Sequence, residues 1–356
     1  MSNTWGRKVK ITIFGESHGV GIGAVIDGLP VGEAIDLQQV QLQLARRAPG
    51  NSALATPRKE ADALEVLSGL FEGHTTGAPI CGVIRNTNTR SKDYTPQLPR
   101  PGHADLAAYL KYNGFSDYRG GGHFSGRITA GLVAGGAMAM QILARRGIAI
   151  GAHIAQIENI KDDTFNQITS SLLQGLTESD FPLLNPQVQS AMTRAVLQAK
   201  QQQDSVGGII ECAVCGVPAG LGAPFFESLE SRMASKMFSV PAVKGVEFGA
   251  GFGMASMRGS TANDDIILQN GKFATATNNN GGINGGITNG MPIVVRAAVK
   301  PTPSISQPQT TVDLTTRTET ALTVTGRHDP CIIPRAVCVI EAAVALCILD
   351  AMETDL

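Results

Sequence analysis

Apolar residues fall in short runs along the chain, and the spacing of these runs predicts both strands and helices. Strands are expected over 9–14, 23–26 and 78–86, because each is a short apolar run of strand length. A helix is expected after Asp36, whose side chain can cap it, since the apolar positions that follow recur at helical spacing. That helix should end at Arg47, just before a proline and a glycine.

The two most apolar stretches, 128–143 and 331–349, are predicted to be helices that are buried on all sides. The first is shorter than the roughly 20 residues that a membrane-spanning helix needs, and the second is interrupted by a proline and charged residues. We therefore expect core helices rather than membrane spans.

Three blocks are more polar. Residues 160–204 have helical spacing, and Asn185 followed by Pro186 is typical of a helix start. The blocks 99–126 and 275–290 are rich in glycine, and the first of them is expected to form a long loop region.

Three pairs of short segments echo one another in the two halves of the chain, in the same order and at offsets of 188, 213 and 206 residues. The pairs are Gly28-Leu29-Pro30 with Gly216-Val217-Pro218, Gly77-Ala78-Pro79-Ile80 with Gly290-Met291-Pro292-Ile293, and Gln141-Ile142-Leu143 with Cys347-Ile348-Leu349. We expect one domain over 1–356, with duplicated halves at about 1–150 and 205–356 and a helical insertion at 160–204. This duplication predicts an α+β fold, a β-α-β sandwich in which two sheets enclose the apolar helices.

Composition narrows the class of protein. The 356 residues carry 29 Lys and Arg against 30 Asp and Glu, which argues against a nucleic acid as the main partner. No secretory signal or membrane anchor is expected, and the six cysteines in apolar surroundings suit a reducing, cytoplasmic location. Cys212 and Cys215 have CxxC spacing without a second pair, so a metal or redox role is not predicted for them.

Four histidines, His18, His103, His123 and His328, lie in loops that are rich in glycine and arginine. Glycines let backbone N–H groups approach an anion, arginines clamp carboxylates or phosphates, and a histidine can move protons near neutrality. The residues alone therefore predict a site for an anionic small molecule with acid–base chemistry. A lone histidine in a turn is more often structural, and the prediction depends on the repetition of the pattern.

Other kinds of site find less support. The histidines lack the regular spacing of metal ligands, and neighbouring arginines would repel a divalent cation, so no metal is expected. No strand-to-helix turn carries GxGxxG, and GxxxxGK[ST] is absent. Ser17 next to His18 is not framed by a GxSxG turn, which argues against a nucleophilic serine.

Six strings resemble the chorismate synthase family, and they occur in family order from near the first residue to the last helix. They are GESHG (15–19), RPGHAD (100–105), DYRGGG (117–122), VPAGLG (217–222), AVKGVEFG (242–249) and GRHDPC (326–331). The resemblance implies a sandwich of two antiparallel sheets around a helical layer, assembled as a homotetramer.

The resemblance also implies a reaction. The family converts 5-enolpyruvylshikimate 3-phosphate into chorismate and phosphate by an anti-1,4-elimination, a lyase step of the shikimate pathway of aromatic amino acid biosynthesis. It requires reduced FMN without net redox change. NAD(P)H would enter only indirectly, as a source of electrons for the flavin, and an external flavin reductase is the expected partner.

Site residues follow from matching these motifs. The implied catalytic residues are His18, His103 and Asp329. The implied substrate-binding residues are Ser17, Arg47, Arg100, Arg127 and Arg327. The implied FMN-binding residues are His123, Phe124, Ser125, Ala242, Gly285, Lys300, Pro301, Thr302, Pro303, Ser304 and Arg327.

The chain departs from the commonest family pattern at three of the cofactor positions. His123 replaces an arginine, Phe124 a serine and Pro241 an asparagine, so the side-chain contacts of these positions with FMN stay open. Two other classes of function also stay open: an FMN-dependent oxidoreductase or flavin reductase, and a phosphate-ligand-binding protein without activity. The second is disfavoured because binding alone needs arginines and not titrating groups.

Overall fold

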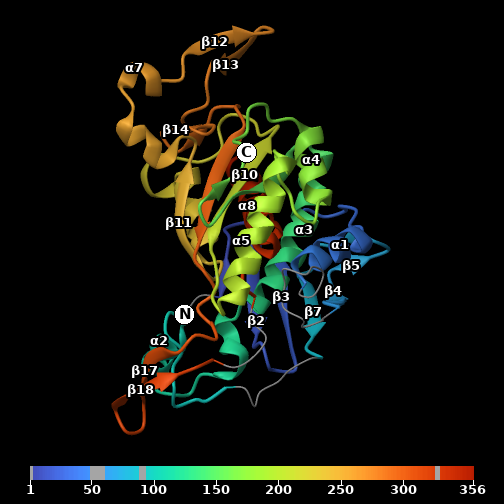
Figure 1. Cartoon of the computed structure of the whole chain (residues 1–356). Coiled ribbons are helices and arrows are strands. Elements are labelled where there is room, and N and C mark those ends of the chain that lie inside the picture. The colour runs from blue at the N-terminus through green and yellow to red at the C-terminus, as the bar shows by residue number, and fades with distance from the viewer. Residues whose placement is uncertain (1–2, 49–60, 88–93, 325–328) are drawn as a thin grey trace.

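The computed structural model describes residues 3–48, 61–87, 94–324 and 329–356. Two five-stranded sheets enclose a layer of helices (Figure 1). All strand pairs of both sheets are antiparallel. The predicted α+β sandwich is confirmed.

The first sheet has the order β1-β2-β3-β7-β4. Its strands are β1 Thr4–Trp5, β2 Lys10–Gly15, β3 Gly21–Asp27, β4 Leu64–Ser68 and β7 Ile80–Arg85. The second sheet, taken from its β9 edge, has the order β9-β8-β10-β16-β11. Its strands are β8 Ala149–Ile157, β9 Ile160–Lys161, β10 Gly208–Cys215, β11 Val243–Phe248 and β16 Ile293–Val299.

The two sheets therefore have the same topology, with β2, β3, β7 and β4 equivalent to β8, β10, β16 and β11. The echoed segments of the sequence lie at equivalent places, beside β3 and β10 and at the starts of β7 and β16. β8 comes before the segment with α4 and α5 and pairs with β10, which follows that segment, so these helices lie between two neighbouring strands of one sheet.

The middle layer is built on the two apolar helices, α3 Thr129–Arg145 and α8 Ile333–Asp355, which pack against each other. α3 also packs on the first sheet and α8 on the second. A side chain at Gly136 would overlap the backbone of Ala342, so the glycine sets how closely the two helices approach. The segment Gly126–Arg145 is apolar and long enough to span a membrane, but 83% of its most apolar 18-residue window is buried inside the fold, as expected of a core helix.

Shorter helices complete this layer. α1 Leu37–Arg47 contacts both α3 and α8, and its equivalent, α6 Leu229–Phe238, contacts α8. Asp36 caps α1 as predicted, since its side chain accepts hydrogen bonds from the backbone N–H groups of Gln38 and Gln39 at 2.8 and 3.3 Å.

Helices α4 Ser170–Glu178 and α5 Gln189–Gln201 connect β8 to β10. Leu173 and Leu176 of α4 pack on Ala213, which places this helix on the outer face of the second sheet. Asn185 caps a short 3-10 turn, Pro186–Val188, and α5 begins only after that turn.

The prediction that 99–126 is a loop was wrong in part. This block holds the helix α2 Asp105–Lys111 and the 3-10 turn η2 Arg119–Phe124. Three consecutive glycines in η2 have positive φ, which explains why the sequence alone predicted a loop. The remaining elements are β5 Leu70–Phe71, β6 His74–Thr75, η3 Gly126–Ile128, η5 Phe225–Glu227, η6 Gly251–Ser256, α7 Gly259–Ala262, β12 Ile266–Gln269, β13 Lys272–Thr275, β14 Ile283–Asn284, β15 Ile287–Thr288, β17 Gln309–Asp313 and β18 Thr318–Leu322.

Candidate active site

A cavity of about 1000 Å³ lies where α3 and α8 both begin. Ile11 and Ile13 of β2, Leu132 of α3, and Ala336 and Val339 of α8 give it an apolar floor. The N-terminus of a helix carries partial positive charge, so two of them at one cavity favour an anionic ligand.

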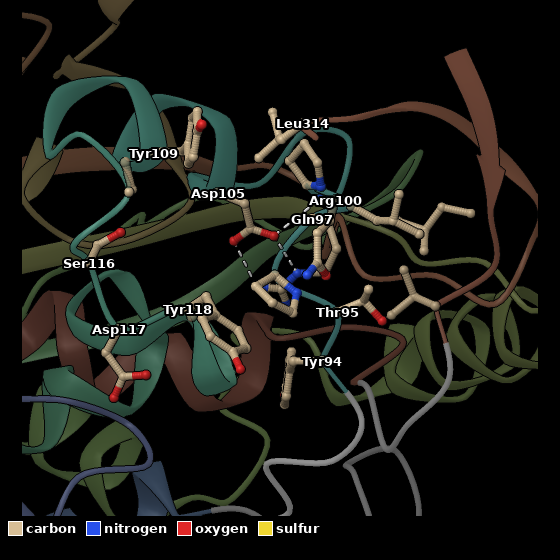
Figure 2. Close-up of a pocket in the computed structure, with 18 of the residues that line it drawn as sticks. Tyr94, Thr95, Gln97, Arg100, Asp105, Tyr109, Ser116, Asp117, Tyr118 and Leu314 are labelled. Atoms are coloured by element: carbon tan, nitrogen blue, oxygen red, sulfur yellow. Dashed lines mark hydrogen bonds and ion pairs between the residues drawn. The ribbon is translucent and has the colours of Figure 1, made fainter. Parts of the chain in front are cut away.

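His103 is held beside the cavity by a carboxylate. Its Nδ1 lies 2.7 Å from Asp105 Oδ1, at the start of α2. Arg100 binds the same carboxylate through Nε at 2.7 Å and Nη2 at 2.9 Å (Figure 2). Burial alone would raise the pKa of Asp105, but the hydrogen bonds from His103 and Arg100 outweigh it and hold this pKa well below its usual range. We assign the Nδ1 proton of His103 to Asp105, which leaves Nε2 for a ligand.

Ser17 and His18 lie on the other side of the glycine-rich turn. A side-chain carbon at Gly120 would lie 2.6 Å from His18 Nε2, and one at Gly121 would lie 3.3 Å from His103 Nε2. The two glycines have φ of +61° and +81°, so the turn needs glycine for both space and conformation. The fold thus brings His18 and His103, 85 residues apart in sequence, to two neighbouring glycines.

Tyr94 contacts both His18 and Arg100. Its ring stands edge-on to the His18 ring at a centroid distance of 5.5 Å, and the Arg100 guanidinium lies 5.2 Å from the Tyr94 centroid. A second pocket of about 360 Å³ opens here, and Figure 2 shows Tyr94, Tyr109 and Tyr118 around Arg100. Arg100 lines this pocket and not the larger cavity.

Arg47 and Arg127 line the cavity and share one buried carboxylate, Asp62. Burial alone would raise the pKa of Asp62, but the two guanidinium groups outweigh it and lower the pKa. Arg127 also donates from Nε to Asn86 Oδ1 at 2.8 Å. Sequence reasoning missed Asp62, because it belongs to none of the recognised motifs and lies far along the chain from Arg127.

Arg335 is a second residue that sequence reasoning missed. It lines the cavity from the first turn of α8, forms an ion pair with Asp329, and donates from Nε to the Arg47 carbonyl at 2.9 Å. The network therefore joins three arginines to two carboxylates, those of Asp62 and Asp329.

Most of the expected cofactor residues line the cavity. They are His123, Phe124, Ser125, Ala242, Lys300, Thr302, Pro303 and Ser304. Pro301 is exposed outside it. Gly285 lies in the turn between β14 and β15, whose next residue packs against the start of α6, whereas the cavity takes in the end of that helix. Arg327 and His328 lie outside the described residues.

A flavin fits these residues. Within the described chain, three buried side-chain polar atoms lack a hydrogen-bond partner, and two of them, Arg47 Nε and Thr302 Oγ1, belong to residues that line the cavity. A bound polar ligand would satisfy such atoms. The apolar floor suits a planar ring, and the volume lies at the upper end of the range for small-molecule sites.

A metal finds no comparable site. Among the described residues no group of three or more His, Cys, Asp or Glu is placed to hold a metal ion. Cys212 and Cys215 are three residues apart on β10, so their side chains point to opposite faces of the sheet. Burial also raises the pKa of the Cys212 thiol well above its ordinary value, which makes it a poor metal ligand.

The sequence model of the chorismate synthase family matches residues 9–352. The chain belongs to the chorismate synthase family. Chorismate synthases of Dehalococcoides mccartyi and Methanocella arvoryzae are 47% and 49% identical to it; the alignments cover 98% of this chain and 96% and 94% of theirs. A crystal structure of a chorismate synthase matches with a TM-score of 0.77 at 30% identity, covering 98% of this chain and 92% of that one.

Membership in the chorismate synthase family makes the chain an enzyme, a lyase of the shikimate pathway. The motifs that carried the resemblance are also the segments that the fold gathers. GESHG, RPGHAD and the RGGG turn meet at Gly120 and Gly121, and Asp329 from the last motif lines the same cavity as His103.

Proposed function

We propose that the chain converts 5-enolpyruvylshikimate 3-phosphate into chorismate and phosphate and that it requires reduced FMN. The observation that carries this proposal is the cluster of arginines at the cavity, which Arg47, Arg127 and Arg335 line together with His103, while His18 lies on the other side of the glycine turn. The substrate carries a phosphate and two carboxylates, which guanidinium groups bind well.

The arginines bind and orient the substrate. Arg47, Arg127 and Arg335 are joined in one network, so their guanidinium groups are fixed before a ligand enters. A prearranged network loses little entropy on binding and neutralises charge as phosphate leaves. We assign Arg100 mainly to positioning, because its guanidinium is engaged by Asp105.

The histidines move protons. His103 has Asp105 behind Nδ1, an arrangement that stabilises the ring when Nε2 has taken up a proton, and we assign it to the departing phosphate. His18 is buried beside Ser17 and is assigned to the protonation state of the cofactor. Asp329, anchored by Arg335 at the cavity, is assigned to assisting removal of the substrate proton.

Thr302 and Ser304, with the backbone of 123–125 and Ala242, would hold the flavin over the apolar floor. Reduced FMN would supply electron density that assists departure of phosphate. The surrounding apolar side chains would exclude water from this step.

We further infer a homotetramer in the cytoplasm that receives its reduced flavin from an external reductase using NAD(P)H. Exposed phenylalanines at 225, 226, 252 and 273 support association between copies, since such side chains are usually covered.

An anaerobic assay of phosphate release tests the proposed function. Turnover is expected with pre-reduced FMN and not with oxidised FMN. Equal rates with both forms, or consumption of NAD(P)H without release of phosphate, would overturn it.

A further inference from the structure

Lys236 is a buried cation that the proposed mechanism does not use. It lies in the last turn of α6, is 2% exposed, and lines the cavity together with Trp5. Among the described residues no carboxylate oxygen lies within 4.0 Å of its ammonium group. Lysine is rarely buried without such a partner, because loss of hydration disfavours its charged form.

The groups around Lys236 compensate only in part. Its ammonium nitrogen lies 3.9 Å from the centroid of the Trp5 ring, a cation–π contact. On α8 it faces Cys347, whose thiol pKa burial raises to about 12, so the thiol is neutral. Asp350 is the acid that acts on Lys236, but three backbone N–H groups, of residues 7, 8 and 9, already donate to that carboxylate at 2.8 to 3.1 Å.

Arg232 is the charged neighbour on α6 itself, one turn earlier, and it is paired with Asp355 and Glu227. Arg232 is itself a cation, and the two carboxylates that pair with it are already engaged, so neither neutralises Lys236. Burial lowers the pKa of Lys236 to about 7, although Cys347 and Asp350 act in the opposite direction. At neutral pH the amine is thus close to half-charged, and an anion brought near it would favour the charged form.

We propose that Lys236 is an anion-binding residue of the cavity. Its ammonium group holds a phosphoryl group of the bound ligand while it keeps its contact with the Trp5 ring. This inference rests on the proposed function for the identity of the ligand. Lys236 lies outside all six strings that resemble the family, so the resemblance assigns it no role. Two phosphoryl groups are available, one on FMN and one on the substrate.

Proton uptake on binding is the direct consequence. A neutral Lys236 in the empty cavity gains a proton when a phosphoryl group arrives, so ligand affinity should fall as the pH rises above about 7. The test is calorimetric titration of the flavin-free protein with oxidised FMN at pH 7.5 and 8.5, in buffers of different ionisation enthalpy. The wild type is expected to take up a fraction of a proton that grows with pH.

Two matched variants separate the effect of the Lys236 charge from the effect of removing any lysine of the protein. Lys236→Met keeps the apolar stem of the side chain and removes its ammonium group, and Lys272→Met removes one lysine from the exposed strand β13. Lys236→Met should abolish the proton uptake that Lys236 contributes. It should also lower the affinity for the ligand about 10- to 100-fold, the range for a lost hydrogen bond to a charged group. Lys272→Met should behave as the wild type.

Further ligands distinguish the two sources of the phosphoryl group. If it belongs to FMN, Lys236→Met weakens FMN and leaves riboflavin, which has no phosphate, unchanged. If it belongs to the substrate, the variant binds FMN normally, and shikimate 3-phosphate added to the FMN-loaded protein binds more weakly. Equal weakening of FMN and riboflavin, or no change for any of the three ligands, would overturn the proposal.

Thermal midpoints of the flavin-free protein give a second reading. The folded state lowers the pKa of Lys236 below that of the unfolded chain, so the unfolded chain binds more protons between about pH 7 and pH 10. Wild-type stability should therefore rise with pH relative to Lys236→Met over this range. A constant difference would contradict a neutral Lys236 and with it the proposal. Absence of FMN binding in the wild type would instead reject the proposed function.

Discussion

The cavity and the outer face of the second sheet both bury charged side chains, but they balance them differently. In the cavity, three arginines share Asp62 and Asp329, and Arg47 Nε still has no hydrogen-bond partner among the described residues. On the sheet, each charge meets an opposite charge at hydrogen-bond distance.

The charges on the sheet form a ladder across four strands. His153 of β8, Glu211 of β10, Arg296 of β16 and Glu247 of β11 are direct neighbours in the strand registers. Arg296 lies 3.1 Å from Glu211 and 2.7 Å from Glu247, and His153 Nε2 lies 3.0 Å from Glu211. Asp162 closes the ladder at 2.8 Å from His153 Nδ1.

The difference separates two uses of buried charge. In the ladder every charged group has an opposite charge at hydrogen-bond distance, so it offers little to a ligand, whereas Arg47 Nε, which lacks a partner among the described residues, favours a bound anion. Variants of the two regions should therefore divide cleanly between lost activity and lost stability.

The largest effect is expected from His103→Ala. A positioned acid or base contributes about 10²- to 10⁴-fold in rate, so turnover with saturating reduced FMN should fall by that factor. The thermal midpoint and FMN affinity should change little, because the ring borders a glycine turn and not the apolar core. The same substitution at exposed His74 should leave all three unchanged. A His103→Ala enzyme with normal turnover would remove this residue from the mechanism.

The ladder should respond in the opposite way. Arg296→Met leaves Glu247 without its cation and Glu211 with His153 alone, and breaking such a buried pair costs about 3 kcal/mol at the lower end of the usual range, since Arg296 and Glu247 are partly exposed. Unfolding by urea measures this loss, while turnover per folded molecule should stay normal. Arg85→Met breaks an exposed pair with Glu65 and should cost under about 1 kcal/mol. Equal losses in both variants would show that the ladder is not special.

The sequence predicted the frame of the molecule better than either charge cluster. Asp36 and the helical spacing after it predicted α1, and the two apolar stretches predicted α3 and α8, because capping and periodicity are local signals. The echoed segments predicted a duplication, and the two sheets share one strand order.

The charge clusters depend on pairing between distant segments. The sequence near Asp62 does not predict its ion pairs with Arg47 and Arg127. The ladder likewise forms only when four strands pair in their observed register. Family motifs supplied the histidines and Asp329, but not Arg335 or Lys236, which lie outside those strings.

Arg127→Ala tests whether the arginines that line the cavity bind the substrate. Losing one charge-assisted clamp removes about 1.5 to 3 kcal/mol of binding, so the KM for the substrate should rise about tenfold or more. Arg127→Lys keeps the charge but loses the bidentate guanidinium, so its KM should lie between those of the wild type and Arg127→Ala. An unchanged KM in both variants, measured with saturating reduced FMN, would place the substrate's anionic groups elsewhere.

The smallest effect is a pH dependence of stability that belongs to the ladder alone. Burial alone would lower the pKa of His153, but hydrogen bonds to Asp162 and Glu211 outweigh it and raise the pKa above its ordinary value. The folded protein therefore binds the His153 proton more tightly than the unfolded chain does. Its contribution is complete below about pH 6.5 and is lost as the pH rises through the folded pKa.

The wild type should accordingly lose stability relative to His153→Gln between pH 6 and 9. The expected size is about 1.5 kcal/mol, the lower end for a hydrogen bond to a charged group. Asp162 and Glu211 stay ionised throughout this range, because hydrogen bonds from His153 outweigh burial and lower the pKa of both. Thermal midpoints at each pH measure the difference, with His74→Gln on exposed β6 as the control. A difference that does not vary with pH would mean that His153 is neutral in the fold, and that Asp162 and Glu211 rather than a cation set the charge at this end of the ladder.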